Sequence, residues 1–159
     1  MMIRKVISGG QTGVDRAGLD SAILAGIPIG GYCPKGRLSE DGTIPEKYPM
    51  IELESPESYY RTEKNVLQSD GTLIINKGEL SQGTKLTVDF CVQYGKPRLV
   101  VQLDAEKIVE PAHVMRWMKA QLISTLNIAG PRESKFPEGI YSDSRTFLDK
   151  LFALMKETA

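Results

Sequence analysis

The sequence is poor in the residues that most often build metal centres and disulfide frameworks. It has two cysteines and one histidine among 159 residues. Cys33 and Cys91 lack the Cys-x-x-Cys spacing, and only His113 could join them, so neither a zinc site nor a disulfide framework is expected. We interpret both thiols as free and without a redox role, in a protein of the cytoplasm.

Long apolar runs and an excess of charge of one sign are also missing. No stretch approaches the roughly 20 apolar residues of a membrane span, and the first ten residues do not have the pattern of a signal peptide. Lys and Arg together number 20, as do Asp and Glu, so no net charge attracts nucleic acid or an anionic membrane. We therefore expect neither partner, and any anionic ligand must be held by a local arrangement of groups.

The overall composition is that of an ordinary globular protein. Hydrophobic residues make up 41% and charged residues 25% of the chain, which argues against a disordered or fibrous protein. The length suits one domain, residues 1–159, that needs no disulfide or metal to fold.

Short apolar, β-branched runs alternate with helical patterns along the chain. This alternation predicts an α/β fold with a mostly parallel sheet that helices cover on both faces. The expected strands are residues 3–7, 27–32, 72–76, 98–103 and 125–129. The expected helices are residues 14–25, 55–68 with Ser55 as N-cap and Pro56 in the first turn, 84–94, 114–122 and 142–156. We interpret the apolar stripe Val114, Trp117, Met118 and Leu122 as core packing.

The loop at residues 8–16, SGGQTGVDR, is the first candidate for a ligand site. In open α/β sheets ligands bind at the carboxyl ends of the strands, and this loop joins a strand to a helix. Its glycines permit positive φ, and free amides at the helix start can hold an anion. The candidate ligand contacts are Gly9, Gly10, Gln11, Thr12 and Gly13. The spacing of Thr12 and Asp15 also fits a capping box, which is compatible with anion binding.

Arg16 places a positive charge in the first turn of the same helix. The helix dipole disfavours a cation there by a few tenths of a kcal/mol, and a bound phosphate would reverse the sign. An ion pair with Asp20, one turn later, is the alternative. The loop does not have the G-x-G-x-x-G pattern, and no fitting acidic residue ends the second strand, so an NAD site is not expected.

Residues 30–42, GGYCPKGRLSEDG, belong to a long segment without periodicity. Compact domains rarely keep such a segment without a functional reason. The candidate ligand contacts in it are Lys35, Gly36 and Arg37. A tight turn held by ion pairs with Glu40 and Asp41 is the alternative.

Two further loops follow strands. In residues 77–87, KGELSQGTKLT, Gly83 and Thr84 open a helix, where Thr84 could cap the helix or contact phosphate. In residues 130–134, GPRES, Arg132 suits bidentate binding of phosphate or carboxylate, whereas a surface salt bridge is the alternative.

The helix after Pro56 carries a polar pair, Arg61 and Asn65, at a spacing of four residues. This spacing lets both side chains face a ligand, with Tyr60 nearby for stacking on a base or pterin. A place in the core is the alternative for Tyr59 or Tyr60.

Five blocks of the sequence resemble the family of putative molybdenum carriers. The blocks are SGGQTGVDRAGLDSA, GGYCPKGRLSEDGTIPEKYP, YRTEKNVLQSDGTLI, GTKLT and NIAGPRES, and they span nearly the whole chain. This family is similar to the molybdenum cofactor carrier proteins of algae and to the lysine-decarboxylase-like, Lonely Guy-type phosphoribohydrolases. The resemblance implies a Rossmann-like three-layer α/β/α fold, a homo-oligomer, and a pocket for a pterin phosphate or a nucleotide-like ligand.

The chain departs from the phosphoribohydrolases at their catalytic residue. Their motif PGGxGTxxE supplies a phosphate cradle and a catalytic glutamate, whereas residues 81–87 here read SQGTKLT. Gly83 and Thr84 match, but Thr87 stands at the place of the glutamate, and a hydroxyl cannot act as a general base at neutral pH. A carboxylate that the fold brings to the glycosidic carbon could replace it: Glu79, Asp89, Asp15 or Glu40.

The leading hypothesis is therefore a binding protein rather than an enzyme. It would hold molybdenum cofactor, or a nucleotide of similar shape, and a metal would arrive on the dithiolene of the ligand, so no protein-ligated metal is expected. One alternative is an enzyme that cleaves the N-glycosidic bond of a nucleotide. Another is a nucleotide sensor that passes ligand occupancy to a partner protein, and the helix at residues 114–122 could line an oligomer interface.

Overall fold

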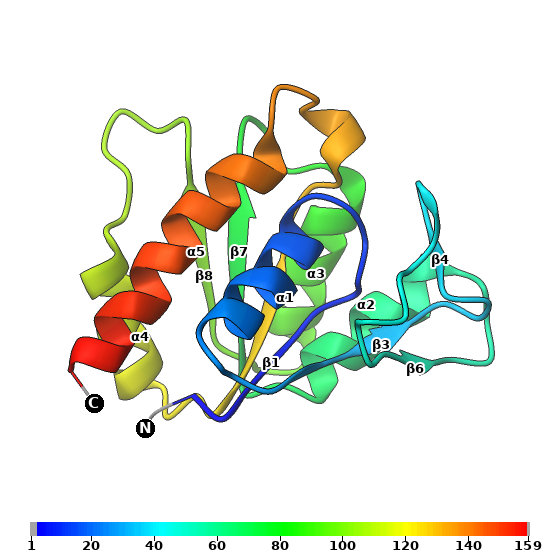
Figure 1. The fold of residues 1–159 in the computed structure, drawn as a ribbon, viewed down its shortest axis with the longest axis horizontal. Helices are drawn as coiled ribbons and strands as arrows, with labels where there is room; N and C mark the ends of the chain where they lie inside the picture. The colour runs from blue at the N-terminus through cyan, green and yellow to red at the C-terminus, as the bar shows by residue number, and fades with distance from the viewer. Residues whose placement is uncertain (1–2, 159) are drawn as a thin grey trace.

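A five-stranded parallel sheet forms the centre of the protein (Figure 1). The computed structural model describes residues 3–158. The strands lie in the order β2-β1-β9-β7-β8. Their bounds are β1 Lys5–Ile7, β2 Ile29–Gly30, β7 Gly71–Asn76, β8 Arg98–Gln102 and β9 Thr125–Ala129. In register, Val6 of β1 pairs with Leu126 of β9, and Ile74 of β7 pairs with Ala129 of β9 and Val100 of β8.

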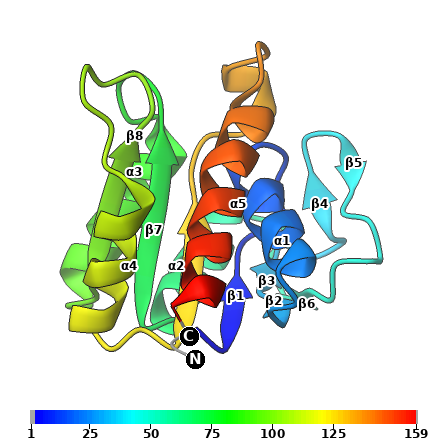
Figure 2. The same cartoon turned by 60° about the vertical axis from the view of Figure 1, so that its left-hand side comes forward.

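Helices cover both faces of this sheet, which confirms the predicted three-layer α/β/α arrangement (Figure 2). The helices α1 (Val14–Leu24), α4 (Pro111–Ala120) and α5 (Ile140–Glu157) lie on one face, and α2 (Ser58–Leu67) and α3 (Gln82–Gln93) lie on the other. A short 3₁₀ turn, η1 (Glu133–Lys135), precedes α5. Because both faces are covered, all six residues of β7 are buried, as expected of a central parallel strand.

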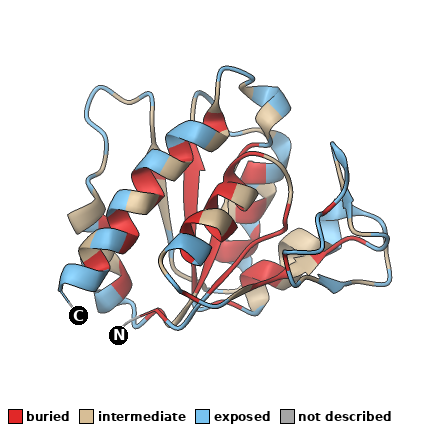
Figure 3. Ribbon diagram, in the orientation of Figure 1, coloured by how far each residue is buried: buried red, intermediate tan, exposed pale blue. Residues whose placement is uncertain are grey.

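The main hydrophobic core lies between the sheet and the helices α1, α4 and α5 (Figure 3). Leu126 and Ile128 of β9 pack there with Leu148 and Phe152 of α5, and all four side chains are at most 1% exposed. Gly18 lets α1 approach β9, since a Cβ at this position would lie 2.9 Å from the Cβ of Ile128. Burial of each large apolar side chain contributes about 1.5–3 kcal/mol.

One predicted strand, residues 27–32, is divided in two by Gly31. Gly31 has φ +132°, and a Cβ there would lie 2.0 Å from the carbonyl oxygen of Ser8. The chain therefore leaves the central sheet, and β3 (Tyr32–Cys33) pairs instead with β6 (Ile51–Glu52). Between them, β4 (Leu38–Ser39) and β5 (Gly42–Thr43) form a hairpin, so the segment predicted as a long loop has its own structure.

The start of α2 also differs from the prediction. The helix begins at Ser58 with Glu57 as N-cap, whereas Ser55 lies before it and its Oγ accepts a hydrogen bond from the Glu57 N–H at 3.1 Å. Ser55 therefore organises the turn that leads into the helix and is not its cap. The other predicted strands and helices agree with the structure to within three residues at either end.

The apolar stripe of α4 is core packing only in part. Val114 and Met118 are fully buried, and Trp117 packs against the core, as predicted. Leu122 lies beyond the end of the helix and is 85% exposed, so its place in the stripe was wrong. Among the described residues, no helix has both the length and the apolar character that a membrane crossing requires.

Candidate functional site

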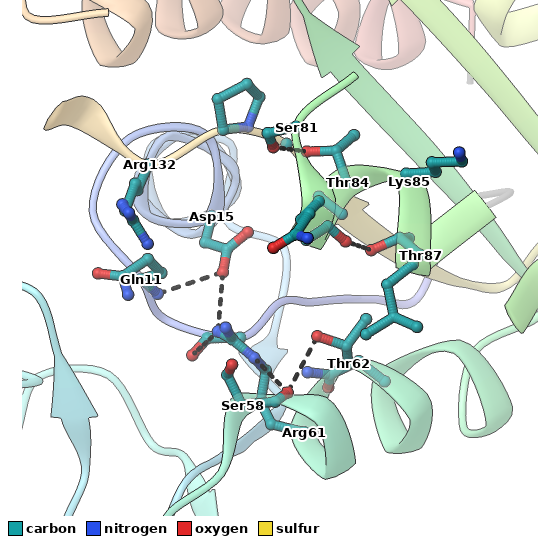
Figure 4. Close-up of a pocket in the computed structure, with 18 of the residues that line it drawn as sticks. Gln11, Asp15, Ser58, Arg61, Thr62, Ser81, Thr84, Lys85, Thr87 and Arg132 are labelled. Carbon is teal, nitrogen blue, oxygen red and sulfur yellow. Dashed lines mark hydrogen bonds and ion pairs between the residues drawn. The ribbon is translucent and has the colours of Figure 1, made fainter. Parts of the chain in front are cut away.

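A cavity of about 750 Å³ opens where the loops after β1 and β9 meet the starts of α2 and α3 (Figure 4). This volume lies within the range of roughly 300–1,000 Å³ that is usual for small-molecule sites. The main lining residues are Gly9, Gln11, Asp15, Ser58, Tyr59, Arg61, Thr62, Asn65, Ser81, Gln82, Gly83, Thr84, Lys85, Thr87, Asp89, Asn127, Pro131, Arg132 and Lys135. The cavity therefore lies at the carboxyl ends of the strands, the edge of the sheet at which the sequence predicts ligand binding.

The structure brings part of the predicted site to this cavity. The predicted residues that line it are Gly9, Gln11, Arg61, Asn65, Gly83, Thr84 and Arg132. The predicted residues that do not line it are Gly10, Thr12, Gly13, Arg16, Lys35, Gly36 and Arg37. Three of the four candidate loops and the helix α2 thus converge, whereas the second loop lies to one side.

The glycine-rich loop after β1 uses most of its amides within the protein. The Val14 N–H, at the start of α1, donates to the Pro131 carbonyl at 3.2 Å, and the Arg16 N–H donates to the Gln11 carbonyl at 3.2 Å. The Gln11 N–H donates to Asp15 Oδ2 at 3.2 Å. This loop therefore surrounds a carboxylate of its own helix, in the position where the sequence predicts an external anion.

The predicted capping box between Thr12 and Asp15 does not form. Gly13 is the N-cap residue of α1, with φ +79° and no hydrogen bond from a side chain. Thr12 Oγ1 instead donates to Glu40 and accepts a hydrogen bond from the Glu133 N–H at 3.2 Å. Thr12 therefore joins the first loop to η1, and Asp15 is left to face the cavity.

Asp15 is a buried carboxyl group of the cavity with a raised pKa. It is only 7% exposed, and burial raises its pKa to about 6 against the opposing effects of Arg61, the Gln11 amide and Arg16. Arg61 Nη1 lies 3.5 Å from Asp15 Oδ2, and the two side chains are seen together in Figure 4. A carboxyl group with such a pKa in a cleft is a candidate functional group. From the sequence, Asp15 is expected as part of a capping box or as a replacement base, and not as a ligand contact.

Asn65 lines the cavity, but its amide group is engaged elsewhere. Its Oδ1 accepts from the Tyr32 N–H at 2.9 Å, and its Nδ2 donates to the Tyr32 carbonyl at 3.0 Å. Asn65 is 2% exposed, so these bonds satisfy a buried polar group. The contact fixes α2 against β3 and so positions Arg61, one turn earlier on the same helix.

The start of α3 presents an open set of backbone donors to the cavity. Within residues 3–158, the N–H groups of Gln82, Gly83 and Thr84 donate no hydrogen bond to another protein group. Apart from its chain neighbours and the backbone of its own helix, no protein atom lies within 4 Å of the position that a Cβ on Gly83 would take, so a ligand can approach the backbone there. Ser81 Oγ and Thr84 Oγ1 lie 3.1 Å apart at the same helix start. Together with the positive end of the helix dipole, these groups suit an anion.

Basic side chains outnumber acidic ones around the cavity. The basic residues are Arg61, Lys85, Arg132 and Lys135, and the acidic residues are Asp15 and Asp89. Lys85 lies in the first turn of α3, which has no acidic residue, although the helix dipole disfavours a cation there. An anion bound at this helix end would stabilise Lys85 in its place.

Arg16 forms an ion pair within the protein, but its partner is not Asp20, the partner considered as the alternative to phosphate. Its guanidinium donates to both carboxylate oxygens of Asp41, at 2.6 and 2.8 Å, and to Ser39 Oγ at 2.9 Å. The hydrogen bonds that Asp41 accepts from Arg16 and from Ser39 Oγ hold its pKa at about 2. Asp20 instead accepts hydrogen bonds from the hydroxyls of Tyr48 and Tyr141.

Arg37 organises the second loop from within. Its Nε donates to the Ile44 carbonyl at 3.2 Å, and its Nη2 donates to the carbonyls of Pro45 and Tyr48 at 2.9 and 2.8 Å. The Gly36 N–H donates to Glu52 Oε1 at 2.8 Å, and Lys35 is exposed. The predicted ligand contacts of this loop, Lys35, Gly36 and Arg37, therefore stay predictions without a place in the cavity.

Glu40, at the tip of the β4–β5 hairpin, connects the first and fourth loops. It accepts hydrogen bonds from Thr12 Oγ1 and from both the N–H and the Oγ of Ser134, and it lies 3.3 Å from Arg132 Nε. The pKa of Glu40 lies below its usual value. Partial burial acts to raise this pKa, but the hydrogen bonds from Ser134 and Thr12 together lower it by more. The hairpin thus helps to shape the rim of the cavity without lining it.

The two tyrosines of α2 are both outside the core. Tyr59 lines the cavity and is 46% exposed, with its ring edge-on to those of Tyr60 and Phe90 at 5.3 and 5.1 Å. Tyr60 is 47% exposed and does not line the cavity. The aromatic ring available for stacking is therefore that of Tyr59, and the core interpretation was wrong for both residues.

Within the described part of the chain, residues 3–158, no group of three or more His, Cys, Asp or Glu side chains could hold a metal ion. The hydrogen-bond donors of the cavity are amides, hydroxyls and basic side chains, which suit an oxyanion.

Comparisons with known proteins agree with the predicted family. The model of the circularly permutated YpsA SLOG family matches residues 6–152. A crystal structure of the "putative molybdenum carrier protein" from Syntrophus aciditrophicus SB has a TM-score of 0.87 and 50% sequence identity, and the match covers 95% of each chain. Among curated proteins, none is significantly similar. The predicted resemblance to the putative molybdenum carriers is confirmed, and the chain belongs to the circularly permutated YpsA SLOG family.

Proposed function

We propose that the protein binds a small phosphate-bearing ligand in this cavity and that the ligand is molybdenum cofactor or a nucleotide of similar shape. The observation that carries the proposal is the start of α3, which lines the cavity with three backbone N–H groups that have no protein acceptor within residues 3–158, together with Lys85. An oxyanion there would satisfy the amides, interact with the helix dipole and neutralise a cation placed against that dipole.

The rest of the cavity suits the remainder of such a ligand. Arg61 and Arg132 offer further charged donors, and the ring of Tyr59 offers a flat surface for a pterin or base. A protein 50% identical to this chain is named a putative molybdenum carrier protein, which supports a molybdenum-related cargo. A metal would be held by the dithiolene of the ligand. Homo-oligomerisation and a cytoplasmic location remain predictions.

Thermal unfolding with a ligand panel tests the proposal. The panel comprises free phosphate, AMP, ADP-ribose, cyclic nucleotides, molybdate and molybdopterin. A ligand at about 100 times its dissociation constant adds about 2.7 kcal/mol, which raises the Tm of a protein of this size by roughly 5–10 °C. Selective stabilisation by molybdopterin or molybdate supports a carrier, whereas selective stabilisation by a nucleotide supports a nucleotide-binding protein. Stabilisation by none of them contradicts the proposal.

A matched pair of lysine variants locates the site. Lys85→Ala removes the cation at the start of α3 and is expected to weaken binding about tenfold, because a charge-assisted hydrogen bond is lost. Lys107→Ala removes an exposed lysine outside the cavity and is expected to bind as the wild type does. Equal binding by both variants would place the anion elsewhere.

Hydrolysis of the N-glycosidic bond of a nucleotide is the second candidate, and Asp15 is the observation that favours it. Thr87 lines the cavity, and its Oγ1 donates to the Gly83 carbonyl at 3.1 Å. Of the four carboxylates considered as replacements for the missing glutamate, Asp15 and Asp89 line the cavity, whereas Glu40 and Glu79 do not. A pKa of about 6 suits Asp15 to proton transfer near neutral pH.

Product analysis separates this activity from simple binding. Purified protein is incubated with nucleoside monophosphates, and the released base and ribose phosphate are measured. An enzyme releases both, Asp15→Asn abolishes the release, and Asp89→Asn serves as the comparison. Retained binding without any release across the panel contradicts the enzymatic candidate and leaves the binding protein.

A further inference from the structure

The floor of the cavity contains a buried ion pair whose cation is only loosely held. The side chains of Arg61 and Asp15 are 14% and 10% exposed, and Arg61 Nη1 lies 3.5 Å from Asp15 Oδ2. The other hydrogen bonds of the guanidinium are also long, at 3.4 Å from Nη1 to the Gly9 carbonyl and 3.4 Å from Nε to the Ser58 carbonyl. Within residues 3–158, Arg61 Nη2 donates to no protein group. A ligand oxyanion can therefore form stronger hydrogen bonds with this guanidinium than its present partners do.

Asp15 depends on Arg61 for its negative charge. Burial disfavours the charged form of the carboxyl group, and among the groups that oppose this effect Arg61 has the largest influence, ahead of the Gln11 amide and Arg16. Arg16, on the same helix, is already bound to Asp41. The other charged groups around the cavity are Lys85 and Asp89 on α3, and Arg132 and Lys135 after β9. None of these four forms an ion pair with Asp15 in the described structure.

We propose that an oxyanion bound in this cavity draws Arg61 away from Asp15, and that Asp15 takes up a proton as the ligand binds. The inference rests on the proposed function, since it requires an anion in the cavity. Two negative charges close together in a buried site disfavour each other, and a proton on Asp15 removes this repulsion. The neutral carboxyl group can then donate a hydrogen bond to an oxygen of the ligand.

Proton uptake makes ligand affinity depend on pH in one direction. Because linkage is reciprocal, a ligand that raises the proton affinity of Asp15 binds more tightly when the proton is already present. A ligand-induced rise of one pKa unit corresponds to about tenfold tighter binding at about pH 5 than at about pH 8. Asp15 is then a specificity residue of the site, since it favours ligands whose nearest group can accept a hydrogen bond.

Sulfate is the probe that tests this inference, because it stays a dianion across this pH range. Sulfate is added at constant ionic strength to the full chain, labelled with ¹⁵N and ¹³C, at several pH values between about 5 and 8. The backbone signals of Gly83 and Thr84 report binding, and the Cγ signal of Asp15 reports its protonation directly. The expected result is about tenfold tighter binding at the acid end, with the Asp15 titration shifted to higher pH by bound sulfate.

Two variants complete the test. Asp15→Asn is expected to bind sulfate equally across the pH range, with an affinity close to that of the wild type at about pH 5. Asp89→Asn, which changes the other carboxylate of the cavity, is expected to retain the pH dependence. If Asp15→Asn fails to fold, the Asp15 signal of the wild type decides the question alone.

The possible failures are distinguishable. Sulfate that shifts the Gly83 and Thr84 signals equally at all pH values, with an unchanged Asp15 titration, overturns the inference and leaves the anion site intact. Sulfate that shifts no cavity signal at any pH overturns the anion site and the inference together.

Discussion

Replacement of Asp15 by asparagine is expected to change the pH dependence of stability in a defined direction. The pKa of Asp15 rises from 3.8 to about 6 on folding, chiefly because the carboxyl group is buried. Between these two values the folded protein holds a proton that the unfolded chain releases. The contribution of Asp15 to stability is therefore complete below about pH 4 and is lost as the pH rises through about 6.

The magnitude follows from the size of the pKa shift. A shift of about two units corresponds to about 3 kcal/mol between the two limits. Asparagine has nearly the same shape and does not titrate in this range, so the stability of Asp15→Asn does not fall in this way as the pH rises. The free energy of unfolding of the variant, relative to the wild type, is expected to increase by about 3 kcal/mol from about pH 4 to about pH 7.5.

Urea unfolding followed by circular dichroism, at closely spaced pH values, measures this difference. Equal urea m-values for the two proteins would show that the variant unfolds from the same folded state. Asp41→Asn provides a control of opposite sign. Arg16 and Ser39 hold the Asp41 pKa at about 2, so Asp41 stabilises the fold above about pH 4 and this contribution is lost as the pH falls. A difference between Asp15→Asn and wild type that stays constant across the range would refute the reasoning for Asp15.

Three further substitutions separate binding from structure. Gly83→Ala is expected to raise stability by up to about 1 kcal/mol in thermal unfolding, because alanine has the higher helix propensity and the added methyl group meets no protein atom beyond its neighbours and its own helix backbone. Sulfate affinity measured by NMR is expected to fall, because the methyl group enters the proposed anion site. Arg37→Ala removes three hydrogen bonds to carbonyl groups and is expected to lower the free energy of unfolding in urea by about 2–4 kcal/mol, with sulfate affinity unchanged. A parallel fall in sulfate affinity would support a ligand contact for Arg37. Gly31→Ala places a Cβ 2.0 Å from the Ser8 carbonyl oxygen and is expected to yield little soluble protein. A variant that unfolds cooperatively with the same midpoint as the wild type would contradict this expectation.

The sequence predicts the central sheet well because parallel strands have a strong local signature. Residues 71–76, GTLIIN, are buried at every position, and the three consecutive apolar residues Leu73, Ile74 and Ile75 mark a strand that helices cover on both faces. The break at Gly31 has no such signature. A glycine inside an apolar run also occurs in ordinary strands, and the reason for the break here is a close approach to Ser8, which is distant in the sequence.

The candidate site is predictable to the level of loops, but only in part to the level of side chains: Arg61 and Arg132 line the cavity as expected, whereas Arg16, Lys35 and Arg37 do not. The rule that ligands bind at the carboxyl ends of strands identifies three of the loops that converge on the cavity. Asp15 and Arg16 are neighbours in the first turn of α1, and the sequence does not reveal which of them faces the cavity. The partners of Arg37 are backbone carbonyls in its own loop, and no residue type in the sequence indicates them.

Through Glu40, changes in the β4–β5 hairpin, which lies outside the cavity, can alter the specificity of the cavity for its ligand. The Glu40 carboxylate accepts hydrogen bonds from Thr12 and Ser134, which lie near opposite ends of the chain and meet here in the fold. Residues that share one such network do not contribute independently, so substitutions at these three positions are expected to show epistasis in stability and affinity. Related proteins can therefore acquire different ligand preferences through paired changes in the hairpin and the rim, while the sheet and the start of α3 stay the same.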